Sequence, residues 1–123
     1  MTSNNLTGKN VVIIGGTAGI GLAAVQAAAA AGANVWAAGR SEGHIESAKQ
    51  VANGSFEVRQ ADTHDAASLE AIFKEVGTID HLVSAAVGGE RTLKPFLEQT
   101  EDQFKAAYDK LWGYAKVVRT GAP

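Results

Sequence analysis

A run of glycines between residues 15 and 21 has the composition and the spacing of a phosphate-binding turn. The segment reads Gly-Gly-Thr-Ala-Gly-Ile-Gly and follows the apolar run 11–14. Gly15 allows a tight turn out of a strand, Gly19 lets the backbone approach a diphosphate, and Gly21 lets a helix pack closely on a sheet. That helix would direct its unpaired N–H groups toward the anion. The segment therefore predicts a cradle for the pyrophosphate of a dinucleotide.

The elements that would position this turn follow from the hydrophobic pattern, which alternates between strand and helix periods. Strands are expected at 11–14, 34–38, 56–60 and 81–85. Helices are expected at 20–31, from the N-cap Ser41 to 53, from the N-cap Asp65 to 76, and after a capping box that starts at Thr100. The expected core-facing stripes are Ile45, Ala48 and Val51; Leu69, Ile72, Phe73 and Val76; and Phe104, Ala107, Tyr108, Leu111, Ala115 and Val118.

Four strands that alternate with helices predict an α/β fold with right-handed crossovers. The expected architecture is a Rossmann-type parallel sheet of strand order 3-2-1-4, flanked by helices, which is an incomplete doubly wound fold. No linker or low-complexity tract divides the chain, so residues 1–123 are interpreted as a single dinucleotide-binding domain.

The end of the second expected strand bears on which dinucleotide would bind. An NAD site usually has an acid there, about twenty residues after the glycines, to accept the ribose hydroxyls. Gly39 and Arg40 occupy that place, and a guanidinium can hold a phosphate with two charge-assisted hydrogen bonds. This pattern favours NADP(H) over NAD(H), with Arg40 as a solvated loop residue being the alternative. Ser41 could add a hydroxyl contact or serve only as the N-cap.

Composition excludes several other classes of protein. The net charge is −2, so no basic surface for nucleic acid is expected, and the absence of cysteine excludes disulfides and Cys-based zinc sites. No metal site is expected, because His44, His64 and His81 lie in separate elements without ligand spacing. The sequence has no apolar segment long enough for a membrane span and no signal-peptide pattern, so a cytoplasmic location is expected.

The spacing of the turn resembles that of the short-chain dehydrogenase/reductase family, whose signature is Thr-Gly-x-x-x-Gly-Ile-Gly. Ile14 replaces the threonine, and the three glycines and Ile20 match. The resemblance continues at Asp62-Thr63, where the family has an Asp that binds adenine, and at 84–87, which replaces the family's Asn-Asn-Ala-Gly. The cofactor-binding residues that the pattern and the resemblance imply are Gly15, Thr17, Gly19, Ile20, Gly21, Arg40, Ser41, Asp62, Thr63, Ser84, Ala85 and Ala86.

The family's chemistry requires a Ser and a Tyr-x-x-x-Lys pair, and this chain contains no such pair. Tyr108 is followed four residues later by Trp112, and Tyr114 by Val118. Lys110 stands where the family has a helix Asn, which implies a divergent member. The resemblance covers the N-terminal, cofactor-binding half of a family member, so the chain is expected to be truncated relative to the family. No catalytic residue is assigned.

Three interpretations of function remain open at this point. The chain is the NADP(H)-binding portion of an oxidoreductase that transfers hydride between NADP(H) and an alcohol or carbonyl, or a non-catalytic dinucleotide-binding module, or a remnant that folds by self-association. The fourth strand would lie at a sheet edge with Leu82 and Val83, and Leu111 and Val118 would lack a neighbour. We therefore expect either a homo-oligomer or a missing C-terminal half.

Overall fold

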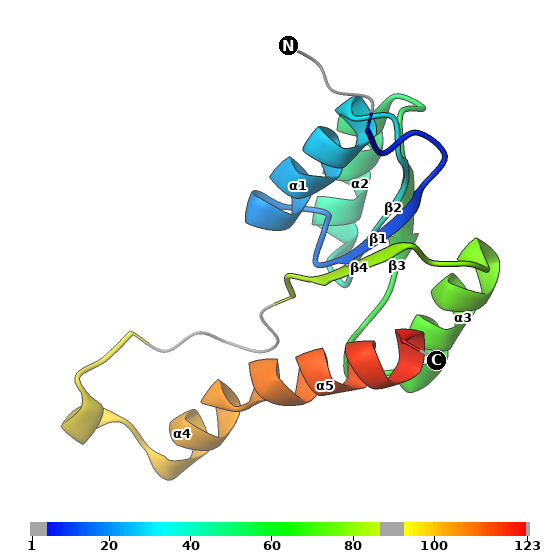
Figure 1. Cartoon of the computed structure of the whole chain (residues 1–123). Coiled ribbons are helices and arrows are strands. Elements are labelled where there is room, and N and C mark those ends of the chain that lie inside the picture. The colour runs from blue at the N-terminus through cyan, green and yellow to red at the C-terminus, as the bar shows by residue number, and fades with distance from the viewer. Residues whose placement is uncertain (1–4, 87–92, 123) are drawn as a thin grey trace.

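A parallel sheet and the helices between its strands form the body of the protein (Figure 1). The computed structural model describes residues 5–86 and 93–122, and within them the sheet has four strands in the order β3-β2-β1-β4. This confirms the expected fold class and strand order. The elements are β1 (Asn10–Ile14), α1 (Gly19–Ala30), β2 (Asn34–Gly39), α2 (Glu42–Ala52), β3 (Glu57–Gln60), α3 (Ala66–Val76), β4 (His81–Ser84), the 3₁₀ helix η1 (Phe96–Glu98), α4 (Glu101–Ala107) and α5 (Asp109–Gly121).

Strand β1 is the centre of the sheet and separates two apolar cores. Side chains alternate along a strand, so Val11 and Ile13 face α1 and α2, whereas Val12 and Ile14 face α3 and α5. All four are buried, which is why this strand is a continuous apolar run. In Figure 1, α1 and α2 lie on one side of the sheet, and α3 and α5 lie on the other.

The expected helix caps are confirmed. The Ser41 hydroxyl accepts a hydrogen bond from the His44 N–H at the start of α2, and the Asp65 carboxylate accepts one from the Ala67 N–H at the start of α3. Thr100 and Gln103 form the complete capping box of α4. Asn53 ends α2 in the left-handed conformation, with φ of 42°.

Two of the expected apolar stripes differ from the structure. In α2 the third buried residue is Ala52, and Val51 is half exposed. The last helix is divided at Tyr108 into α4 and α5, and α5 turns Gly113 and Val117 toward the core. Val117 is fully buried because α5 packs against α3 and β4. Leu111 and Val118 are more than half exposed, in agreement with the expectation that they lack a neighbour.

A polar network joins β2 and β3 to α3. Arg59 Nε lies 2.9 Å from Glu75 Oε1, and Trp36 Nε1 donates to Glu75 Oε2 at 3.1 Å. The hydrogen bond from Arg59 lowers the pKa of Glu75 below its ordinary value. This network joins α3 to β2 and to the edge strand β3.

In the described residues, no helix combines the length and the apolar character that crossing a membrane requires.

Candidate functional site

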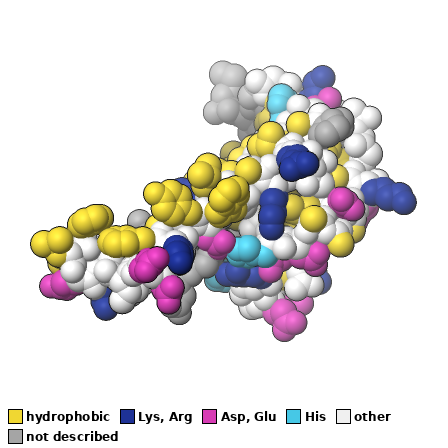
Figure 2. Space-filling view, turned by 90° about the horizontal axis from the view of Figure 1, so that it is seen from below, with side chains coloured by type: hydrophobic (Ala, Val, Ile, Leu, Met, Phe, Trp, Pro, Cys, Tyr) yellow, Lys and Arg dark blue, Asp and Glu magenta, His cyan; other side chains and the backbone are white. Residues whose placement is uncertain are grey.

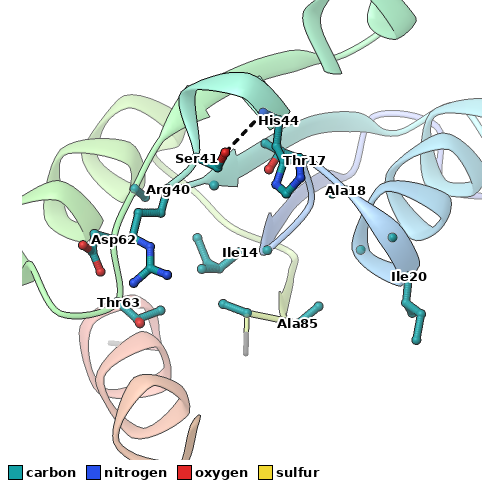
Figure 3. Close-up of a pocket in the computed structure, with 16 residues that line it drawn as sticks. Ile14, Thr17, Ala18, Ile20, Arg40, Ser41, His44, Asp62, Thr63 and Ala85 are labelled. Carbon is teal, nitrogen blue, oxygen red and sulfur yellow. Dashed lines mark hydrogen bonds between the residues drawn. The ribbon is translucent and has the colours of Figure 1, made fainter. Parts of the chain in front are cut away.

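A cleft of about 420 Å³ opens at the carboxyl ends of the four strands (Figure 3). Ligands of open α/β sheets bind at this edge, where the loops that follow the strands meet. The cleft is lined by every residue of the predicted site except Ser84: Gly15, Thr17, Gly19, Ile20, Gly21, Arg40, Ser41, Asp62, Thr63, Ala85 and Ala86. Ile14, Ala18, Gly39, His44 and Ala61 complete the lining.

The turn between β1 and α1 requires glycine at two positions for steric reasons. Gly15 has φ of 88°, and its N–H donates to the Ala38 carbonyl at 2.7 Å. A Cβ atom at Gly15 would overlap the backbone of Ala86, and one at Gly21 would overlap the Gly15 carbonyl. These two glycines let β1, α1 and the segment after β4 approach one another closely.

Gly19 differs from these two because it faces open space. Its φ is +57°, and a Cβ atom added to it would meet nothing within 4 Å. Its backbone is therefore accessible to a ligand from the cleft. This is the arrangement that close approach of a diphosphate requires.

The N-terminus of α1 is suited to bind an anion. The first helical hydrogen bond is donated by the Leu22 N–H to the Ala18 carbonyl, and Ala18 supplies no side-chain cap. The amides at the start of a helix have no intrahelical acceptor, and the helix dipole adds partial positive charge there. Ile20 extends from this turn with 88% of its surface exposed, at the edge of the cleft.

The end of β2 presents a cation to the cleft and has no space for an acid. A Cβ atom at Gly39 would overlap Thr17 Oγ1 and lie 2.9 Å from Thr17 Cγ2, and Thr17 is buried. Arg40 follows on the exposed side and extends toward the loop that holds Asp62 and Thr63 (Figure 3). Asp62 is the acidic residue among those that line the cleft.

The loop after β3 is organised by hydrogen bonds. The Asp62 N–H donates to Ser68 Oγ at 3.0 Å, and the Asp62 carboxylate accepts from the His64 N–H at 2.9 Å. The His64 ring lies between two carboxylates, with Nδ1 3.2 Å from Asp62 and Nε2 2.5 Å from Asp109 of α5. The hydrogen bond to Asp109, with a smaller effect of Asp62, raises the pKa of His64 above its ordinary value.

Sequence reasoning did not assign this role to His64. The sequence showed only that His64 lacks metal-ligand spacing with the other histidines, and Asp109 lies 45 residues further along the chain. No short-range spacing connects the two residues. Only the packing of α5 beside the loop brings them together.

Two predicted residues are not brought to the cleft. Ser84 lies at the end of β4 with its Oγ buried, and this atom has no hydrogen-bond partner among the described residues. The two residues after it do line the cleft, and the fourth residue of that segment, Val87, is outside the described residues. Lys110 is exposed on α5, with Nζ 5.5 Å from the centre of the Tyr114 ring, and it does not line the cleft.

The described lining of the cleft carries groups suited to binding a nucleotide. This described lining contains no lysine, tyrosine or cysteine, and the described residues contain no group of three residues suited to hold a metal ion. The helix amides and Arg40 can hold phosphates, and Asp62 and Ser41 can accept or donate hydrogen bonds. These groups can orient a nucleotide along the edge of the sheet.

Comparison with known proteins agrees with this geometry. The family model described as short chain dehydrogenase matches residues 9–123, and the chain therefore belongs to the short-chain dehydrogenase/reductase family. It is 34% identical over 104 residues to human L-xylulose reductase, a match that covers 85% of this chain and 41% of that protein. It is 37% identical over 98 residues to the short-chain dehydrogenase/reductase prx4 of Penicillium rubens, over 80% of this chain and 28% of that protein.

Solved structures show the same fold. A short chain dehydrogenase/reductase family protein superposes with a TM-score of 0.80 at 29% identity, over 95% of this chain and 49% of that one. The crystal structure of a putative betaketoacyl-ACP reductase gives 0.79 at 28% identity, over 96% of this chain and 49% of that one. The chain thus spans about half the length of these structures and less of the curated relatives. Membership of the family implies a nicotinamide dinucleotide as cofactor.

Proposed function

We propose that this chain is the NADP(H)-binding portion of a short-chain oxidoreductase that acts in the cytoplasm on an alcohol or carbonyl substrate. When bound, the nicotinamide would supply the hydride chemistry of such a reaction, as the hydride donor to a carbonyl or the hydride acceptor from an alcohol. Residues 1–123 hold and orient the dinucleotide as a single binding domain. Family membership supports a nicotinamide dinucleotide as the cofactor. The preference for NADP(H) over NAD(H) is supported by one feature of the cleft.

That feature is the end of β2, where Gly39 and Arg40 stand in place of an acid. A carboxylate side chain at position 39 would hydrogen-bond the ribose hydroxyls of NAD and repel a 2′-phosphate. Here its Cβ atom would overlap Thr17, so the position is restricted to glycine. Arg40 lines the cleft at this point and can pair with the phosphate through two parallel N–H donors.

The remaining lining residues fit the rest of the dinucleotide. The open backbone at Gly19 and the amides at the start of α1 suit the pyrophosphate. The loop of Asp62 and Thr63 suits the adenine, for which the Asp62 carboxylate would accept a hydrogen bond from the exocyclic amine. Ile20 is exposed beside the turn, where bound dinucleotide would cover it.

The proposal includes an apolar surface that further protein covers, either a second copy of this chain or the C-terminal half of a family member. Strand β4 forms one edge of the sheet, and Val83 in it is 39% exposed. Figure 2 shows apolar side chains along the arm that η1, α4 and α5 form. The large exposed apolar residues of this arm and of the segment just before it are Leu93, Phe96, Leu97, Tyr108, Leu111, Trp112 and Val118. A surface of this kind is expected to be covered by protein. If a second copy covers it, sedimentation equilibrium should show a dimer or larger species, and a stable monomer would contradict self-association.

Calorimetric titration of the 123-residue chain with NADPH and with NADH tests the proposed cofactor. A hydrogen bond to a charged group is worth about 1.5–3 kcal/mol, so NADPH should bind about 10- to 100-fold more tightly than NADH. Equal affinities would refute the preference for the 2′-phosphate. Binding of neither dinucleotide would refute the assignment of this chain as a cofactor-binding portion.

A further inference from the structure

His64 is the one histidine of the described residues that has a carboxylate within 4.0 Å of each ring nitrogen. Asp62 belongs to the loop that lines the cleft, and Asp109 is the first residue of α5. We call this contact the His64 bridge. It joins the last helix of the chain directly to the part of the cleft assigned to adenine.

A second contact fixes the same two elements. Thr63 is buried and lies against Gly113 of α5, where an added Cβ atom would be only 3.0 Å from Thr63 Oγ1. The His64 bridge and this close packing are one helical turn apart on α5. The position of α5 and the position of the loop that holds Asp62 and Thr63 therefore depend on each other.

The charge state of the imidazole determines how many of the two carboxylates it can hold. An imidazolium carries an N–H on each ring nitrogen and can donate to both, whereas a neutral ring has a single N–H and can donate to one. The groups that face the ring are Asp62 from its own loop and Asp109 from α5, both acidic. Arg40, from the end of β2, extends toward the same loop from across the cleft (Figure 3).

We propose that His64 is a positioning residue of the dinucleotide site, which holds the Asp62 carboxylate and the start of α5 in place for the adenine and makes cofactor affinity depend on its own protonation. This proposal rests on the proposed function, because it assigns Asp62 to the cofactor. The Asp109 hydrogen bond holds the pKa of His64 above its ordinary value of about 6.5. Both contacts of the His64 bridge are therefore present when the pH lies below that ordinary pKa, and the bridge is lost as the pH rises through the raised pKa of the folded protein.

The test is the affinity of the chain for NADPH from pH 5.5 to 9 in the wild type and in His64→Gln. Glutamine keeps one donor group and cannot reach both carboxylates. The 2′-phosphate of NADPH titrates near pH 6, as phosphate monoesters do, and this titration affects both proteins alike. The quantity compared at each pH is therefore the ratio of the NADPH affinity of the wild type to that of His64→Gln. We expect the wild type to bind about two- to fivefold more tightly at pH 6, the range that exposed ion pairs give, and the ratio to approach one at pH 9.

His81→Gln is the matched control, because His81 is exposed at the start of β4 and does not line the cleft. This variant should follow the wild type at every pH. Asp109→Asn provides a second test that leaves His64 in place. In this variant, the NMR titration of the His64 ring should move to lower pH, and NADPH binding at pH 6 should weaken as in His64→Gln.

Binding of neither NADPH nor NADH at any pH would overturn the proposed function and this inference with it. Normal binding with an affinity ratio that stays constant from pH 5.5 to 9 would overturn the role of His64 alone. An unchanged His64 titration in Asp109→Asn would overturn the bridge itself, even if His64→Gln failed to fold.

Discussion

Substitution of Gly39 provides a sharp test of how the end of β2 is built. In Gly39→Ala the new Cβ atom would overlap Thr17 Oγ1 and lie 2.9 and 3.0 Å from Thr17 Cγ2 and Cβ, well inside ordinary contact distances of about 3.5–4.0 Å. Thr17 is buried and has a short side chain, so it cannot move away freely. Overpacking of this kind costs about 1–3 kcal/mol. For a chain of this size the melting temperature should fall by roughly 5–15 °C.

Thermal unfolding followed by circular dichroism measures this effect. Gly43→Ala in α2 is the control, because its Cβ atom would meet only Ser41 Oγ, at 3.9 Å. That change should leave the stability unchanged or raise it by up to about 0.5 kcal/mol, since alanine favours helix but Gly43 lies in the first turn of α2. Adding Thr17→Gly to Gly39→Ala should recover part of the lost stability. A melting temperature of Gly39→Ala equal to that of the wild type would refute the steric argument.

The same geometry predicts that Gly39→Asp alone will not change the cofactor preference from NADPH to NADH, because the aspartate has no space beside Thr17. Calorimetric titration of Gly39→Asp and of Gly39→Asp/Thr17→Gly with both cofactors tests this prediction. Glu75→Gln should cost about 0.3–1 kcal/mol at pH 7, because the pair with Arg59 is partly exposed. Because the pKa of Glu75 is lowered in the folded protein, the stability difference between wild type and Glu75→Gln is present above the ordinary pKa of about 4.3 and is lost as the pH falls through the folded-state pKa. Urea unfolding of both proteins at pH 7 and pH 3 would show this loss. Equal stabilities at pH 7 would contradict the network. Asn53→Gly should leave stability unchanged or slightly higher, whereas Asn53→Val should lower it by about 1–2 kcal/mol, because φ there is 42°.

The fold and most of the cleft could be predicted from the sequence because their determinants are local. The apolar run of β1, the caps Ser41 and Asp65 and the glycine turn each have a mechanism that acts within a few residues. Parallel strands then place the segments that follow them at one edge of the sheet. This is how residues as far apart as Gly15 and Thr63 could be assigned to one site.

The features that could not be predicted depend on how elements pack together. The side of α5 that meets the core is set by the close fit of Gly113 against Thr63, which an apolar stripe does not reveal. Strand β4 ends at Ser84, one residue earlier than expected, and the Ser84 Oγ is buried without a hydrogen-bond partner among the described residues. The His64 bridge requires Asp109, whose proximity exists only after α5 has docked.

Titration of Arg40→Ala with NADPH and with NADH tests whether Arg40 at the end of β2 selects NADP(H), as we propose. Arg40→Lys is the matched control, because it keeps the charge and loses the paired donors. We expect Arg40→Ala to bind NADPH about 10- to 100-fold more weakly than the wild type and NADH with nearly unchanged affinity. The affinity of Arg40→Lys for NADPH should lie between those of the wild type and Arg40→Ala. Equal losses for NADPH and NADH would contradict the claim.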